Sequence, residues 1–114
     1  MLGTASIADL ALKADKTDTV LETTLSRGRK AGTTIGTASF AFGINVEASG
    51  GYSVALRMLS VASANYAKAE GYVATASGQA SHAEGSRTTA SARNAHSEGT
   101  QTTASAEAAH SEGT

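Results

Sequence analysis

Three histidines and three glutamates recur at a fixed spacing toward the C-terminal end of the sequence. Each histidine precedes a glutamate by two residues, and the pair returns every 14 residues as His82 and Glu84, His96 and Glu98, His110 and Glu112. We call these six residues the His-Glu ladder. A spacing of two places both side chains on one face of a β-strand, and the repeat stacks like residues on like. Imidazoles and carboxylates so arranged can share hydrogen bonds, bind a metal ion or transfer protons.

The upstream residues in the same positions of the repeat indicate where the ladder face points. These residues are Phe40 and Phe42, Val54 and Leu56, then Lys68 and Glu70. Because two of the three pairs are apolar, we expect the face to point inward or toward a neighbouring chain. A buried charge needs a partner, so the favoured interpretation is a structural network in which histidines and glutamates hydrogen bond to one another and set the register. The alternative is a solvent-exposed ladder that has no structural role.

Metal binding and catalysis are the other two interpretations of the ladder. A threefold axis could gather three imidazoles around an ion, but a continuous ladder lacks the single closed site that zinc prefers. A Ser-His-acid mechanism needs one asymmetric constellation with an oriented nucleophile, whereas every candidate here is repeated. We therefore expect no catalytic residue, no metal, no cofactor and no enzymatic activity.

The ladder belongs to a tandem repeat that covers residues 30–114, in about six units. Thr88-Thr89-Ala90-Ser91, for example, returns as Thr102-Thr103-Ala104-Ser105. Glycine, serine and threonine throughout the units exclude a coiled coil, and the period is too short for a helical solenoid. The pattern instead predicts a β-solenoid in which each unit forms two short strands and two turns. Glycines mark the expected turns, where positive φ costs little: Gly43, Gly71, Gly85, Gly99 and Gly113.

The composition argues against a compact single chain. Ala, Ser, Thr and Gly occupy 65 of the 114 positions, and Leu, Ile, Val and Phe only 17. The large apolar residues thus fall below the roughly 20 % at which a globular core becomes doubtful. A net charge of -1 and the absence of proline do not fit disorder. Because a single roll of small side chains buries too little apolar area to offset its ordering entropy, we infer an obligate homo-oligomer.

Residues 1–29 precede the repeat and form a separate N-terminal segment. Ser6 and Asp9 resemble a capping box and predict a short helix over residues 7–15. The β-branched residues between Thr19 and Leu25 predict a lead-in strand, and the basic residues at 27–30 predict a turn. The segment is interpreted either as a trimerisation or attachment collar or as a partly ordered tail.

The repeat motifs are similar to those of a known family. Ser53-Val54-Ala55-Leu56 resembles the core of the 14-residue head repeats of trimeric autotransporter adhesins, the YadA-like head family. The Ser-His-Ala-Glu-Gly and Thr-Thr-Ala-Ser runs are more similar to a variant found in tail-fibre and appendage proteins of phages and prophages of Gram-positive bacteria. The resemblance covers roughly three quarters of the chain. It implies an all-β fold, a left-handed parallel β-roll (β-solenoid), with three chains around a threefold axis. Arg57 departs from the pattern, because the adhesin repeat has glycine there.

The function that the resemblance implies is structural. We expect a segment of a homotrimeric phage or prophage tail fibre in the virion, a rigid spacer with tail or baseplate proteins at its N-terminus and a host-surface receptor as candidate partners. Outward residues that vary between units could contact such a receptor: Arg87, Arg93, Gln101 and Glu107. The head of a bacterial surface adhesin is the alternative, and a depolymerase would need a further domain.

Membranes and nucleic acids are not expected as partners. The sequence has no recognisable secretion signal and no apolar run of roughly 18 residues, so we expect no membrane insertion. The near-neutral net charge of -1 gives no electrostatic footprint for nucleic acid.

Overall fold

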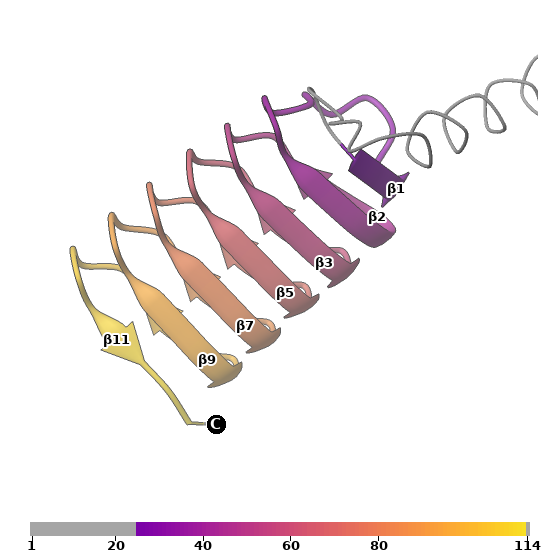
Figure 1. Cartoon of the computed structure of the whole chain (residues 1–114). Helices are drawn as coiled ribbons and strands as arrows, with labels where there is room; N and C mark the ends of the chain where they lie inside the picture. The colour runs from indigo at the N-terminus through magenta and orange to yellow at the C-terminus, as the bar shows by residue number, and fades with distance from the viewer. Residues whose placement is uncertain (1–24, 114) are drawn as a thin grey trace, which may run out of the picture.

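A computed structural model describes residues 25–113 of the chain, which form a β-solenoid of parallel strands (Figure 1). The principal extents are 46 × 23 × 21 Å, so the molecule is a short rod. The described residues contain no helix, and hence none that is long and apolar enough to cross a membrane. The helix expected over residues 7–15 and most of the lead-in strand from Thr19 to Leu25 lie outside the described residues.

Two parallel sheets form the walls of the rod and meet in one long strand, β2. Sheet A contains β1 (Leu25–Arg29), β2 (Phe40–Ala48), β3 (Val54–Met58), β5 (Lys68–Tyr72), β7 (His82–Ser86), β9 (His96–Thr100) and β11 (His110–Ser111). Sheet B contains the second half of β2 with β4 (Val61–Ala62), β6 (Thr75–Ala76), β8 (Thr89–Ala90) and β10 (Thr103–Ala104). Figure 1 shows the strands of sheet A side by side, one for each coil.

Successive coils pair in a constant register of 14 residues. In sheet A, His82 pairs with His96, and in sheet B, Thr89 pairs with Thr103. The backbone N–H of His82 donates to the carbonyl oxygen of Ala95 at 2.9 Å, which continues the ladder from one coil to the next. The predicted β-solenoid of 14-residue coils, with two strands and two turns in each coil, is confirmed.

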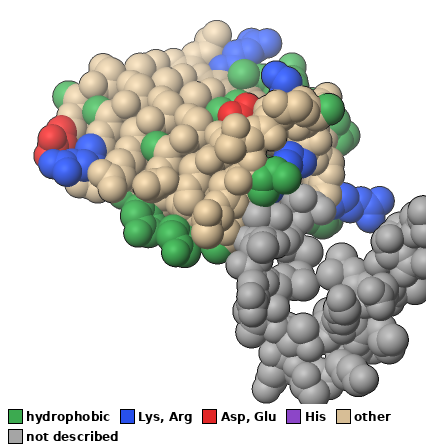
Figure 2. All heavy atoms as spheres, turned by 90° about the horizontal axis from the view of Figure 1, so that it is seen from above, with side chains coloured by type: hydrophobic (Ala, Val, Ile, Leu, Met, Phe, Trp, Pro, Cys, Tyr) green, Lys and Arg blue, Asp and Glu red, His purple; other side chains and the backbone are tan. Residues whose placement is uncertain are grey.

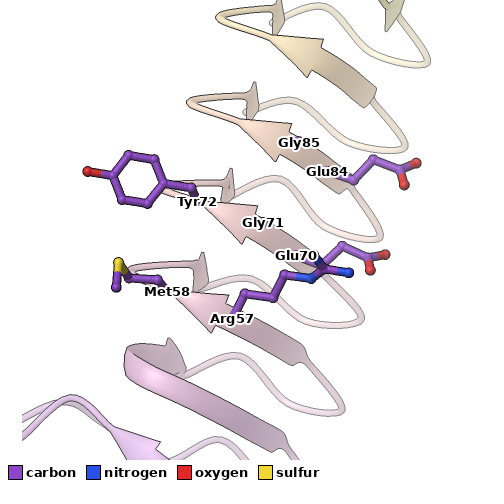
Figure 3. A pocket seen from close by; sticks show the side chains of 7 residues that line it. All are labelled: Arg57, Met58, Glu70, Gly71, Tyr72, Glu84 and Gly85. Carbon is purple, nitrogen blue, oxygen red and sulfur yellow. The ribbon is translucent and has the colours of Figure 1, made fainter.

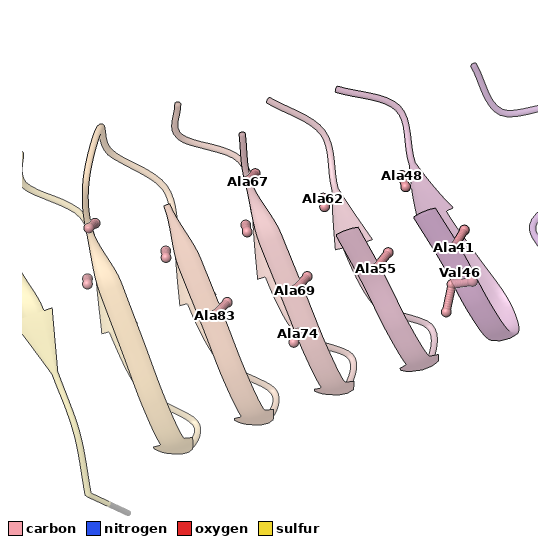
Figure 4. Close-up of a cluster of buried hydrophobic side chains, with 13 residues drawn as sticks. Ala41, Val46, Ala48, Ala55, Ala62, Ala67, Ala69, Ala74 and Ala83 are labelled. Carbon is pink, nitrogen blue, oxygen red and sulfur yellow. The ribbon is translucent and has the colours of Figure 1, made fainter. Parts of the chain in front are cut away.

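The interior of the roll is built from small side chains, chiefly alanine, with buried serine and threonine among them. Val46 is the largest fully buried side chain, and every other buried hydrophobic residue is alanine (Figure 4). Buried hydroxyls bond within the roll: Ser60 donates to the carbonyl oxygens of Leu56 at 2.8 Å and Gly71 at 3.0 Å. Because the two sheets lie so close together, each interior position accepts only a small side chain. Figure 2 shows one outer face of the molecule, on which the backbone and uncharged polar side chains predominate.

The glycines expected at turns have positive φ, but four of them lie within strands instead. Gly43, Gly71, Gly85 and Gly99 occupy β2, β5, β7 and β9, with φ between 109° and 152°. The reason is close approach between coils, because a Cβ at Gly85 would overlap the carbonyl oxygen of Gly99 in the next coil. The left-handed turn positions carry other residues, including Val73 at φ 58°. Their N–H groups bond to the preceding coil: that of Val73 donates to the Met58 carbonyl at 3.0 Å.

Arg57 occupies the glycine position of the second coil. It pairs with Gly43 and Gly71 and has φ 86°, a backbone conformation that costs a non-glycine residue about 1–3 kcal/mol. We predict that Arg57→Gly raises the free energy of unfolding by about 1 kcal/mol, after allowing for the larger entropy of glycine in the unfolded chain. Denaturant unfolding measures this change. Arg57→Ala is the control, because it removes the side chain and keeps the strain; equal stabilisation by both variants would contradict the explanation.

The N-terminal end of the stack is covered by β1. This strand pairs with β2 through Leu25 and Phe40, with a bulge between Arg27 and Arg29, so a strand stands where the sequence predicted a basic turn. The Arg29 guanidinium donates to the Ala48 carbonyl at 2.9 Å and therefore bonds to the outermost strand of sheet B. Burial lowers the pKa of Arg29. These contacts satisfy backbone groups that an open end of the roll would leave free.

Candidate functional site

The His-Glu ladder lies on the outer face of sheet A. His82 and Glu84 flank the fully buried Ala83 on β7, and His96 and Glu98 flank the buried Ser97 on β9, so the period of two turns the ladder away from the interior. Of the two orientations that we expected, the inward one is therefore wrong, and the one toward a neighbouring chain stays a prediction. The histidines of β7 and β9 are half-buried, with 32% exposure for His82 and 34% for His96, whereas His110 and Glu112 are exposed.

The imidazoles lie between carboxylates of two successive coils. The Nε2 atom of His96 is 3.1 Å from Glu84 Oε1 in the preceding coil and 3.6 Å from Glu98 Oε1 in its own coil. His82 Nε2 is similarly 3.4 Å from Glu70 Oε1 and 3.8 Å from Glu84 Oε1. A neutral imidazole has one N–H, which donates to one of the two carboxylates at a time. The structure thus brings histidines and glutamates of separate coils into one zigzag of polar contacts.

The imidazole rings also stack on one another. The ring centroids of His82 and His96 are 4.7 Å apart with an angle of 1° between planes, and those of His96 and His110 are 4.7 Å apart at 4°. His110 Nε2 lies 4.0 Å from Glu98 Oε1 and 3.4 Å from Glu112 Oε1. All six predicted ladder residues are therefore neighbours, as the 14-residue register requires.

The zigzag begins at Glu70, which sequence reasoning had not counted as part of the ladder. Its carboxylate lies 3.3 Å from Lys68 Nζ and 3.4 Å from His82 Nε2. Burial by itself raises the pKa of Glu70, but the hydrogen bonds and charges of Lys68 and His82 outweigh this effect and lower the pKa. The 14-residue spacing from Glu84 was the signal that could have identified Glu70 as a member.

The lowered pKa of Glu70 makes stability depend on pH. A carboxylate whose pKa is lower in the folded than in the unfolded state contributes stability above the unfolded value of about 4.3, and this stability is lost as the pH falls through the folded value. We predict that stability falls less steeply in Glu70→Gln than in the wild type between about pH 5 and pH 3. Denaturant midpoints across this range test it. Lys68→Met should flatten the profile in the same direction; profiles parallel to the wild type in both variants would contradict the prediction.

A shallow pocket of about 370 Å³ lies beside the start of the zigzag. It is lined by Arg57, Met58, Glu70, Gly71, Tyr72, Glu84 and Gly85 (Figure 3). Figure 3 shows the two glutamates extending to the same side from successive coils, while Met58 and Tyr72 extend to the other side. The glycines leave the backbone of sheet A uncovered between these two rows, which forms the hollow. The pocket combines carboxylates with apolar surface and contains no arrangement of nucleophile, base and oriented acid.

The N-terminal half of the ladder face is apolar. Phe42 is 52% exposed and Ile44 58% exposed, and neighbouring rings of Phe40 and Phe42 lie 6.3 Å apart. We call the apolar patch the outward residues of β2 and β3, namely Phe40, Phe42, Ile44, Val54, Leu56 and Met58. Large side chains therefore lie outside the roll and alanines inside it, the reverse of an ordinary domain.

The variable outward residues are divided between two edges of the rod. Arg87 and Gln101 share one turn column, and the Arg87 guanidinium lies 5.8 Å from the ring centroid of Tyr72. Arg93 and Glu107 lie in the other, where their side chains form an exposed ion pair at 3.5 Å. The four residues suggested as receptor contacts thus do not form one surface.

Two stacked tyrosines lie at the N-terminal end of one turn column. Tyr52 and Tyr66, each 57% exposed, stack with centroids 5.4 Å apart, and Tyr52 borders a hollow of about 430 Å³ that Ile35 and Asn65 also line. The 14-residue spacing of the two tyrosines was the signal in the sequence that could have identified this pair.

The fold and the ladder together define a β-solenoid repeat protein with an apolar and a polar half on one outer face. Comparisons with protein-family models, curated proteins and solved structures found no match to this chain.

Proposed function

We propose that this chain is a structural protein, a rigid segment of a homotrimeric fibre in which three left-handed rolls pack together through the apolar patch. The observation that carries the proposal is the exposure of Phe42 and Ile44 on an outer face beside an interior made of alanine. Contiguous exposed apolar surface of this kind marks an interaction site. A second and a third copy of the same chain would cover it and supply the apolar burial that one roll lacks.

The shape of the molecule supports a role as a rigid segment of a fibre. Each coil bonds to its neighbours through the backbone at every strand and turn, and the rod is about twice as long as it is wide, at 46 × 23 × 21 Å. Stacks of this kind resist bending because each layer is fixed by the layers on both sides.

The assembly that we propose is a phage or prophage tail fibre or appendage, located in the virion. The resemblance of the Ser-His-Ala-Glu-Gly and Thr-Thr-Ala-Ser runs to repeats of such proteins supports it. Tail or baseplate proteins would hold one end, and a host-surface receptor would be contacted along the rod. Antibodies against the chain should label the tails of particles released by prophage induction; labelling of intact bacterial cells instead would favour an adhesin head.

Sedimentation equilibrium tests the trimer directly. We expect a mass of three times 11.4 kDa for the wild-type chain. The double variant Phe42→Asp, Ile44→Asp introduces charges into the patch and should dissociate the trimer. Tyr66→Asp is the matched control, because Tyr66 is equally exposed, at 57%, but lies on a turn outside the patch. A folded wild-type monomer at micromolar concentration, or a double variant that remains trimeric, would refute the proposal.

A further inference from the structure

The ladder contains two groups of three side chains with the composition of a metal site. His82, Glu84 and His96 form the first group, and His96, Glu98 and His110 form the second; within each group the ligand atoms lie within 4.8 Å of one another. Against the expectation of no metal from the sequence, we propose that the ladder binds one Zn²⁺, or another late first-row divalent ion, per chain, in one of these two groups. His96 is the ligand that the groups share.

Two of the three distances in the first group lie near those of a tetrahedral ion. Ligand atoms about 2.0–2.2 Å from zinc lie about 3.3–3.6 Å from one another in a tetrahedron. The Glu84 carboxylate lies 3.1 Å from His96 Nε2 and 3.8 Å from His82 Nε2, which brackets this range. The rings of His82 and His96 stack in parallel 4.7 Å apart, so both imidazoles must turn to direct a nitrogen at the same ion. Their side chains are about one-third exposed, which leaves space for this rotation on the solvent side.

The second group repeats this geometry one coil later with slightly longer distances. The Glu98 carboxylate lies 3.6 Å from His96 Nε2 and 4.0 Å from His110 Nε2. His110 is also more exposed, at 50%. The first group should therefore be the tighter one. Three protein ligands leave the fourth position to water, as in zinc sites that are open on one side.

The donor types and the local charge select the class of ion. Two imidazole nitrogens and one carboxylate suit zinc, copper and nickel, whereas magnesium requires oxygen ligands in an octahedron. The column carries four glutamates and a single lysine, Lys68, so the charges of these carboxylates and this ammonium sum to a negative value that attracts a cation. This surplus is a property of one chain and does not depend on the proposed trimer.

Sharing of His96 limits the number of ions. One imidazole nitrogen binds one ion, so occupancy of either group deprives the other of a ligand. The repetition of the motif therefore gives a stoichiometry of one ion per chain and not two. It also gives each terminal histidine a substitute, since loss of His82 leaves the second group complete and loss of His110 leaves the first.

Equilibrium dialysis of the full chain against Zn²⁺ at about pH 7.5, where neutral histidine is available as a ligand, tests the proposal. The wild type should bind one Zn²⁺ per chain, with Mg²⁺ unable to compete. Binding of no Zn²⁺ at about 0.1 mM, a concentration at which even a weak site would fill, would overturn the proposal, as would two ions per chain.

The variants distinguish shared from independent ligands. His96→Ala should weaken binding by about 100-fold or more, since even outer-shell changes at metal sites cost 10- to 100-fold. His82→Ala and His110→Ala should each retain binding within about tenfold, while the double variant His82→Ala, His110→Ala should lose it although His96 is present. Arg93→Ala, on a turn and not in the ladder column, is the control for an unrelated surface change. Zinc binding that is retained in His96→Ala, or lost completely in His82→Ala alone, would overturn the proposal that the two groups share His96.

Folding controls keep this test interpretable. Circular dichroism of each variant should match the wild type, and His96→Gln provides a second substitution that preserves a hydrogen-bonding side chain of similar size. It should lose zinc binding as His96→Ala does. Retained binding in His96→Gln would count against the proposal.

Discussion

Gly85→Ala is expected to lower the free energy of unfolding by about 3 kcal/mol or more, enough to unfold a roll of marginal stability. The added Cβ would overlap the carbonyl oxygen of Gly99, which belongs to the backbone ladder and cannot turn aside. Relief of the overlap requires β7 and β9 to separate, and this weakens the hydrogen bonds on both sides of the substitution. Thermal and denaturant unfolding followed by circular dichroism measure the loss.

Gly113→Ala is the matched control for this prediction. Its φ of 121° is close to the 118° of Gly85, so both substitutions carry the same backbone strain. A Cβ at Gly113 meets no atom within 4 Å. We therefore expect Gly113→Ala to cost only the strain, about 1–2 kcal/mol. Equal losses in the two variants would show that backbone strain, and not the approach of coils, requires glycine.

Ala90→Leu is the second substitution from which we expect a large loss. Ala90 is fully buried in β8 and stacks between Ala76 and Ala104, with the strands of sheet A facing it across the roll. A leucine has no space there unless the two sheets separate over several coils. Overpacking of a tight core costs about 1–3 kcal/mol, and more where the backbone must move, so we expect 3 kcal/mol or above.

Thr89→Leu tests whether position and not residue type causes this effect. Thr89 precedes Ala90 in the same strand but points outward and is only partly buried. The same leucine there should change the free energy of unfolding by no more than about 0.5 kcal/mol. If Ala90→Leu were as stable as Thr89→Leu, the interior would have to be far more adaptable than its alanine packing implies.

The coil architecture was predictable because repetition fixes it. Once His82 and His96 are recognised as equivalent, the 14-residue register of every pair of coils follows. The alternation of side chains along a strand then places Ala83 on the opposite face from His82 and Glu84. The ladder was predictable for the same reason, since parallel in-register stacking places like residues together.

Other features depend on information that a single sequence does not contain. The pattern favours glycine at Gly85, but close approach of coils and turn formation would both explain it, and only the neighbouring Gly99 carbonyl distinguishes the two. Val73 gives no signal of a left-handed turn, because bonds from adjacent coils override its preference for extended conformations. The sequence left two orientations open for the apolar patch, inward or toward a neighbouring chain, because apolar residues of a core and of an interface look the same in sequence.

The constant register of the coils has a consequence at the level of the gene. Each coil contacts only the coils before and after it, and His82, His96 and His110 repeat the same contacts. Unequal recombination that adds or removes the codons of one whole repeat unit would lengthen or shorten the rod by one coil and leave the strand pairing in both sheets unchanged. A unit one codon shorter or longer would put the inner and outer side chains of that coil out of register with those of its neighbours. The length of the rod can therefore evolve in steps of one coil.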